Sequence, residues 1–232
     1  MGAQLALDPS LKLEHDDIHV WTVPIASGEV RAEDWQTLSA AERAKANSYR
    51  FKRDTIRFAR SRLALKRILA KYIGIAPHSV SFRYNEFGKP YLPLEVTPSL
   101  QFNLSHSHDL AVIAVCSHAE IGIDVEYPIE LEYLEVARHF FAETEIQFLC
   151  TRAQDLRDGF LRIWTRKEAC VKAVGSGLSV PLDGFDVLAD TAFPGRQRCY
   201  LTSWRPSGGY HAAVATLGRG GIISHFTLPS GR

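Results

Sequence analysis

Hydrophobic positions along the chain alternate between the two-residue period of strands and the 3.6-residue period of helices. The unbroken apolar run at 110–116 predicts a buried central strand. Apolar residues alternate with others at 121–127, which predicts a strand ended by Pro128. Further strands are expected at 19–23, ended by Pro24, and at 80–84, 198–204 and 210–217.

Helices are predicted from apolar stripes and from signals at their ends. Ser39 is a typical N-cap with Glu42 as its capping-box partner, so a helix is expected over 40–49. A longer helix is expected over 54–73, where Gly74 supplies the stop. Its apolar stripe consists of Phe58, Leu65, Ile68, Leu69 and Tyr72. The other expected helices are 131–141, 144–152 and 160–174, the last closed by the Gly-Ser-Gly at 175–177.

The composition is that of an ordinary soluble globular protein, with 46% hydrophobic and 23% charged residues among 232. This length suits one large domain or two small ones. No apolar run approaches the ~20 residues that span a membrane, and residues 1–17 lack the basic and apolar regions of a signal peptide. The four cysteines are scattered without a Cys-x-x-Cys pair, so we expect reduced thiols in a cytoplasmic protein.

Charge is distributed unevenly along the chain, although its formal net charge is only +1. Residues 43–71 hold eleven Lys and Arg and a single acid, Asp54. The bias reverses at 120–145, where eight acids face one basic residue, Arg138. The basic block indicates an anionic ligand or partner.

Two acidic segments are candidates for magnesium-assisted phosphate chemistry. Glu168 and Lys172 lie four residues apart on the predicted helix 160–174 and therefore share a face. Asp124 and Glu126 share one face of the predicted strand at 121–127. Three carboxylates and an ammonium group would suit a hard cation and a phosphate.

Each of these features also has a purely structural interpretation. Glu168 and Lys172 alone could form an exposed helix pair, and the two strand acids alone could face solvent on an edge strand. Two like charges on one strand face are nevertheless unfavourable unless solvent or a cation relieves them. The polar segment 102–107 lies at the entrance of a strand, where a histidine is more often a turn residue than a ligand contact. The remaining candidates, His108, His118 and His139, fit no zinc-ligand spacing.

Four segments in order carry a resemblance to a known family. They are Gly-Lys-Pro at 88–90, Phe-Asn-Leu-Ser-His-Ser at 102–107, Ile-Gly-Ile-Asp-Val-Glu at 121–126, and Trp-x-x-Lys-Glu-Ala-x-x-Lys at 164–172. With these segments the chain resembles the Sfp-type 4′-phosphopantetheinyl transferases. The resemblance extends from about Ser39 to Leu188.

The resemblance implies an α+β fold of two similar halves related by a pseudo-twofold, here 1–117 and 118–232, with the ligand in the cleft between them. It also implies a monomer that transfers the 4′-phosphopantetheine arm of coenzyme A to a serine of an apo acyl or peptidyl carrier protein. Adenosine 3′,5′-bisphosphate would be the second product. The basic block would then face polyanionic coenzyme A and an acidic carrier.

The resemblance also assigns roles to particular residues. Asp124, Glu126 and Glu168 would hold Mg²⁺ against the coenzyme A pyrophosphate. Glu168 would also deprotonate the attacking serine, directly or through water. Lys172 would stabilise the charge that develops on the pyrophosphate as the P–O bond breaks.

Further residues would bind coenzyme A by the same resemblance. Ser105 and His106 would contact its phosphates, and Lys89 lies where the family binds the nucleotide. Lys45 falls near a family position that meets the 3′-phosphate. The sequence does not tell which of Arg53, Arg57, Arg60 and Arg62 touch the ligand.

Two other interpretations predict different behaviour. A nucleic-acid-binding protein could use the basic helix, but it would need interleaved aromatic residues or a known motif, and it leaves the carboxylates unexplained. A metal-dependent phosphodiesterase or nuclease could use the same carboxylates, and such a hydrolase would cleave coenzyme A without any carrier protein.

Overall fold

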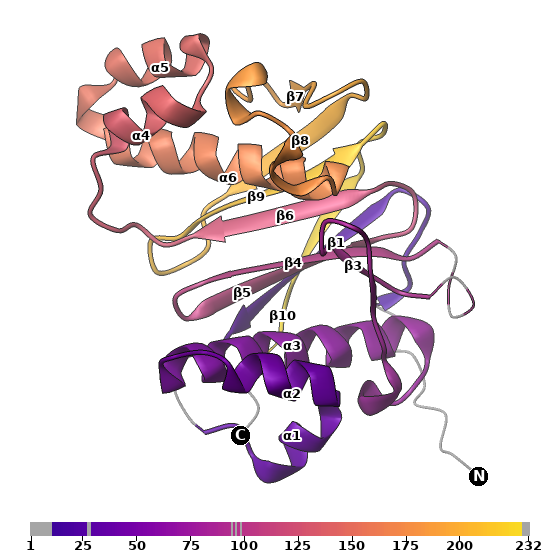
Figure 1. Ribbon diagram of the computed structural model, residues 1–232. Helices are drawn as coiled ribbons and strands as arrows, with labels where there is room; N and C mark the ends of the chain where they lie inside the picture. Colours follow the sequence, from indigo (N-terminus) through magenta and orange to yellow (C-terminus); the bar gives the residue numbers. More distant parts are fainter. Residues whose placement is uncertain (1–10, 27–28, 94, 96, 98, 229–232) are drawn as a thin grey trace.

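The computed structural model describes residues 11–26, 29–93, 95, 97 and 99–228. Two four-stranded sheets lie in the middle of the molecule, with helices covering their outer faces (Figure 1). Separate apolar clusters fill the space under each helical layer, and a third lies between the sheets. No helix in the described part of the chain is long and apolar enough to cross a bilayer.

The first sheet has the strand order β10-β1-β5-β4. β5 lies antiparallel to both of its neighbours, and β10 runs parallel to β1. The last strand of the chain therefore completes the first sheet. The bounds are β1 Asp17–Pro24, β4 Gln101–Ser107, β5 Leu110–Cys116 and β10 Ile222–Thr227.

The second sheet has the strand order β6-β9-β8-β7, with every neighbouring pair antiparallel. Its strands are β6 Ile121–Glu126, β7 Thr191–Ala192, β8 Cys199–Trp204 and β9 His211–Leu217. A separate two-stranded ribbon consists of β2 Arg83–Tyr84 and β3 Pro90–Tyr91.

The helices divide into two groups, α1 to α3 on the side of the first sheet and α4 to α6 on the side of the second (Figure 1). The long helices α3 and α6 pack against the sheets themselves. Their bounds are α1 Ala32–Thr37, α2 Ala40–Asn47, α3 Lys52–Ile73, α4 Tyr133–Phe140, α5 Glu143–Cys150 and α6 Leu156–Val174. Short 3₁₀ turns lie at Pro77–Ser79, Ala153–Asp155, Gly177–Ser179 and Leu182–Gly184.

The two halves repeat the same order of elements. Apart from β10, each begins with a strand, continues through short helices to one long helix, and ends with an antiparallel pair that places its last strand beside its first. Both long helices stop at a glycine with positive φ, Gly74 at 69° and Gly175 at 73°, a conformation that favours glycine. The expected α+β fold of two similar halves is confirmed.

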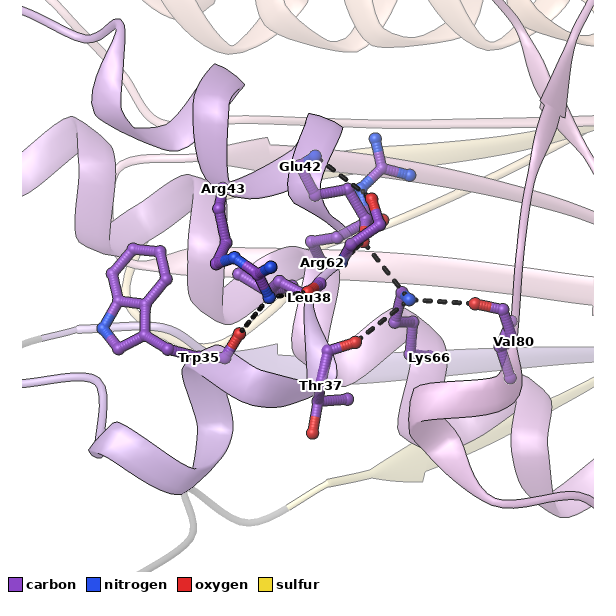
Figure 2. A network of polar contacts seen from close by, with 9 residues as sticks. Trp35, Thr37, Leu38, Glu42, Arg43, Arg62, Lys66 and Val80 are labelled. Carbon is purple, nitrogen blue, oxygen red and sulfur yellow. Dashed lines mark hydrogen bonds and ion pairs between the residues drawn. The ribbon is translucent and has the colours of Figure 1, made fainter.

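A buried ion pair also recurs in both halves. Glu42 of α2 pairs with Lys66 of α3 at 3.2 Å, and Glu145 of α5 pairs with Lys167 of α6 at 2.8 Å. Each lysine lies eight residues before the glycine that closes its helix. Figure 2 shows the first pair, in which Lys66 Nζ also donates to the carbonyls of Thr37 and Val80. Because each lysine is tied to buried acceptors, both pairs fasten a short helix to a long one.

The structure changes several sequence-based expectations about elements. Segment 102–107 belongs to strand β4 itself, because Phe102 and Leu104 point into the core under α3 while the alternate residues are polar. Of the expected strand at 80–84, only residues 83–84 form hydrogen bonds with another strand. The Val80 carbonyl instead accepts a hydrogen bond from Lys66. The Ser39–Glu42 capping box is present, and the four cysteines are free thiols as expected.

Strand β6 packs directly against the backbone of α6. A Cβ atom at Gly122 would lie 2.1 Å from Ala169 O and 2.3 Å from Ala173 N, distances that real side chains do not allow. Gly122 shares its strand face with Asp124 and Glu126. The missing side chain therefore lets the helix approach the face that carries both acids.

We expect Gly122→Ala to lower the free energy of unfolding by about 3 kcal/mol, because the helix must move away from the strand. Urea unfolding measures this change. Gly195→Ala is the matched control, since a Cβ there meets no atom within 4 Å. Equal stability of the two variants would contradict the close packing.

Candidate functional site

A row of polar side chains on β4 joins the two sheets. Asn103 Oδ1 accepts a hydrogen bond from Ile123 N at 3.0 Å. Ser105 Oγ donates to Asp124 Oδ1 at 2.8 Å, and Ser107 Oγ donates to a carboxylate oxygen of Glu126 at 2.9 Å. We call this contact between β4 and β6 the seam. Asn103, Ser105 and Ser107 alternate along β4, so their side chains all lie on one face of the strand.

The long helix α6 brings a cation to the seam. Lys172 Nζ lies 2.6 Å from Asp124 Oδ1 and donates to Ser105 Oγ at 3.0 Å. Asp124 is almost fully buried, at 2% exposure, and its second oxygen Oδ2 has no hydrogen-bond partner. The other face of β6 consists of fully buried Ile121, Ile123 and Val125, as its alternation predicts. The acids therefore face the helix rather than open solvent.

The three carboxylates influence one another electrostatically. Burial, followed by the charge of Asp124, raises the pKa of Glu126 to about 7, while the hydrogen bond from Ser107 opposes the rise. Burial and then Asp124 also raise the pKa of Glu168, against the effect of Lys172. The charge of Asp124 thus makes ionisation of Glu126 and Glu168 costly, a cost that a bound cation would relieve.

These residues fit a hard divalent cation by their chemistry. Clustered carboxylates and an unpartnered buried oxygen are the ligands that Mg²⁺ prefers. No group of three or more His, Cys, Asp or Glu side chains in the described part of the chain is already arranged around a common metal position. Lys172 instead holds one oxygen of Asp124.

Basic side chains extend the site toward α3. His106 is exposed and alternates with the serines of β4, so it lies on the strand face turned toward α3. Desolvation by the surrounding protein, followed by the charges of Lys172, Arg57 and Arg62, lowers the pKa of His106. Cations from α3 and α6 therefore act on one histidine of β4.

A cavity of about 520 Å³ lies between α2, α3 and the segment 78–84. Lys45 and Arg62 line it together with the rings of Phe58 and Phe82. Arg62 Nε lies 3.5 Å from Glu42 Oε1, and its Nε and Nη1 are buried without a hydrogen-bond partner. Figure 2 shows Arg62 beside Glu42 and Lys66. The cavity thus presents an incompletely satisfied guanidinium, which suits an anion.

The structure distinguishes four arginines that the sequence left equivalent, Arg53, Arg57, Arg60 and Arg62. Arg62 alone of these four lines the cavity. Arg57 pairs with Asp109 at 3.0 Å, Arg60 donates to the carbonyl of Ala26, and Arg53 is largely exposed. Burial distinguishes these arginines from one another, and the sequence of a helix with many basic residues does not reveal which of them are buried.

Five of the candidate site residues belong to one cluster. Asp124, Ser105 and Lys172 are in direct contact. Glu126 shares the β6 face of Asp124, Glu168 lies one helical turn before Lys172 on α6, and the charge of Asp124 contributes to the raised pKa of both.

Two candidates lie outside this cluster. Lys45 belongs to the cavity of the first half. Lys89 pairs with Glu120 at 2.8 Å and donates to Ala173 O at the end of α6. Ser107 and Asn103 have no role predicted from the sequence, although the alternation of polar residues along 102–107 was the available signal.

Comparison with known proteins gives one family for both parts of the chain. The family model described as "4′-phosphopantetheinyl transferase, N-terminal" matches residues 29–118. The model described as "4′-phosphopantetheinyl transferase superfamily" matches residues 120–215.

Characterised relatives cover most of the chain. The 4′-phosphopantetheinyl transferase HetI of Nostoc sp. is 39% identical over 74% of this chain and 74% of its own. A 4′-phosphopantetheinyl transferase of Bacillus subtilis is 34% identical over 82% of this chain and 87% of its own. The 4′-phosphopantetheinyl transferase Sfp of Bacillus subtilis strain 168 is 31% identical over 76% of this chain and 81% of its own.

We expect Glu126→Gln to stabilise the metal-free protein at pH 8 and to have little effect at pH 5. Folding raises the pKa of Glu126 from 4.5 to about 7, so the wild type loses stability as the pH rises through this window. Glutamine carries no charge and avoids this loss, which we expect to be about 1–3 kcal/mol.

Urea unfolding at both pH values in EDTA measures the difference. Exposed Glu130→Gln controls for the loss of one acid from the same segment. A Glu126→Gln effect of the same size at pH 5 and pH 8 would contradict the electrostatic cause.

Proposed function

Because the chain belongs to the Sfp-type 4′-phosphopantetheinyl transferases, enzymes that move the phosphopantetheine group of coenzyme A onto carrier proteins, we propose that it performs this transfer at the seam between its two sheets. The acceptor is a serine hydroxyl of an apo acyl or peptidyl carrier protein. The reaction depends on Mg²⁺, and adenosine 3′,5′-bisphosphate is the second product.

The observation that carries this proposal is the state of Asp124. One of its oxygens is held by Ser105 and Lys172, and the other is buried without a partner next to two further carboxylates. Asp124, Glu126 and Glu168 would hold Mg²⁺, which when bound neutralises pyrophosphate oxygens. A structural salt bridge alone would not require the two additional acids.

The side chains of α6 supply the remaining chemistry. Glu168 accepts the proton of the carrier serine, directly or through water, and the raised pKa that burial gives it makes it a stronger base than an ordinary glutamate. The serine oxygen then forms a bond to the β-phosphorus of coenzyme A. The P–O bond to the adenosine bisphosphate breaks, and Lys172 stabilises the negative charge that the leaving phosphate gains.

The basic half of the molecule binds the nucleotide end of coenzyme A. Ser105 and His106 contact phosphates at the seam, and Lys89 binds the nucleotide. Lys45 and Arg62 in the cavity bind the 3′-phosphate, since two cations, one of them a guanidinium with unsatisfied N–H groups, favour a dianion. The acids and the basic cavity thus serve different phosphates of one ligand.

Intact-mass spectrometry tests the activity directly. An apo carrier protein is incubated with the enzyme, coenzyme A and Mg²⁺, and we expect a gain of one phosphopantetheine mass. The gain should vanish when the carrier serine is replaced by alanine. An unmodified carrier, in a panel of fatty-acid and peptidyl carriers, would overturn the proposal. Cleavage of coenzyme A without a carrier would point to a hydrolase instead.

We expect Lys172→Ala to lower kcat by about 10²–10³-fold, with a much smaller rise in KM for coenzyme A, because Lys172 acts on charge that develops in the transition state. Exposed Lys71→Ala is the matched control, since Lys71 lies three residues before Gly74 just as Lys172 lies three before Gly175. Steady-state kinetics separate the two constants, and thermal unfolding confirms that both variants fold. Equal losses in kcat and in coenzyme A affinity would contradict a transition-state role.

We also expect Asp124→Ala to abolish transfer while the protein remains folded. Asp124 contributes the central carboxylate of the proposed metal site, and its removal leaves Lys172 without its partner. Activity is measured across a Mg²⁺ titration, with circular dichroism as the check on folding. A folded, active variant with the Mg²⁺ dependence of the wild type would contradict the metal role.

A further inference from the structure

Two serines of β4 hold the two acids of β6 in the same way. Ser105 Oγ binds one oxygen of Asp124, and Ser107 Oγ binds one oxygen of Glu126, at 2.8 and 2.9 Å. In both carboxylates the second oxygen has no hydrogen-bond partner among the described residues. The serine pair therefore orients the acid pair and leaves one oxygen of each acid available.

The hydroxyl of Ser107 both accepts and donates a hydrogen bond. The Tyr127 amide donates to Ser107 Oγ at 3.1 Å and occupies a lone pair of that oxygen. The hydroxyl proton is thereby left for Glu126. Because Glu126 and Tyr127 are consecutive, Ser107 binds the end of β6 at two points.

The surroundings of Ser107 are rigid. It ends β4 at a tight hairpin whose next residue, His108, has a φ of 47°, unusual for a residue other than glycine. The His108 ring packs on Tyr127 at 4.6 Å, and Asp109 N donates to the hydroxyl of Tyr210. Arg57 of α3 pairs with Asp109. The hairpin tip is thus held by contacts to Tyr127, Tyr210 and Arg57, and it carries Ser107 with it.

We propose that Ser107 is a positioning residue that holds Glu126 in the orientation required to bind the divalent cation. This inference rests on the proposed Mg²⁺ site. Hydrogen bonds to the non-coordinating atoms of metal ligands fix the ligands before the metal arrives, and their loss usually costs about 10–100-fold in metal affinity. Without the hydroxyl, the Glu126 side chain loses its only hydrogen bond within the described residues.

The test measures metal binding apart from catalysis. Mn²⁺ replaces Mg²⁺ because both prefer oxygen ligands, and electron paramagnetic resonance counts the free ion in a titration of the full-length protein. We expect Ser107→Ala to raise the Kd for Mn²⁺ by about tenfold or more. Ser107→Thr, which keeps a hydroxyl, should restore a value close to that of the wild type.

Ser203→Ala is the matched control. Ser203 is also a half-buried strand serine bound to a charged group, since its Oγ accepts from Arg166 Nη1 at 3.0 Å, but it lies on β8, away from the seam. We expect its Kd to equal that of the wild type. Thermal unfolding of all variants shows whether any change in Kd is simply a loss of structure.

The outcomes distinguish this inference from the function on which it rests. If Asp124→Ala loses Mn²⁺ binding while Ser107→Ala binds as the wild type does, the positioning role is wrong and the metal site stands. If the wild type binds Mn²⁺ no better than Asp124→Ala, the metal site falls and the role of Ser107 falls with it. A loss shared equally by Ser107→Ala and Ser203→Ala would also overturn the inference.

Discussion

The direct contact between β6 and the backbone of α6 is the constraint on which the rest of the site depends. Gly122 permits it, because any Cβ at this position would collide with Ala169 O and Ala173 N. Helix α6 therefore approaches closely enough for Lys172 to reach Asp124, which β4 holds from the other side through Ser105. Strand, helix and neighbouring sheet thus converge on one buried carboxylate, at a cost in desolvation that an ordinary core would avoid.

The repeated architecture explains how one molecule combines opposite charges. Both long helices are fastened by a buried Glu–Lys pair and end at a left-handed glycine. At the positions seven residues before that glycine, however, α3 has Arg67 and α6 has Glu168. The same framework therefore offers cations in the first half and carboxylates in the second, which suits a ligand with several phosphates and a divalent cation.

The sequence predicted the parts of the site that depend on local periodicity. The spacing of Glu168 and Lys172 placed both on one helix face, and the alternation of β6 placed Asp124 on the face opposite the apolar core. It could not predict the seam, because the bonds from β4 to β6 join different sheets and no local pattern encodes them. Nor did it show that Lys167, in the segment 164–172, is fully buried and paired with Glu145, since lysines are normally surface residues.

A crystal structure with coenzyme A and Mn²⁺, with anomalous data collected at the manganese edge, would locate both the metal and the pyrophosphate. We expect an anomalous peak in contact with the carboxylates of Asp124, Glu126 and Glu168, with the pyrophosphate of coenzyme A beside it at the seam. A manganese peak elsewhere, or coenzyme A bound away from the seam, would contradict the claim that the junction of the two halves is the active site.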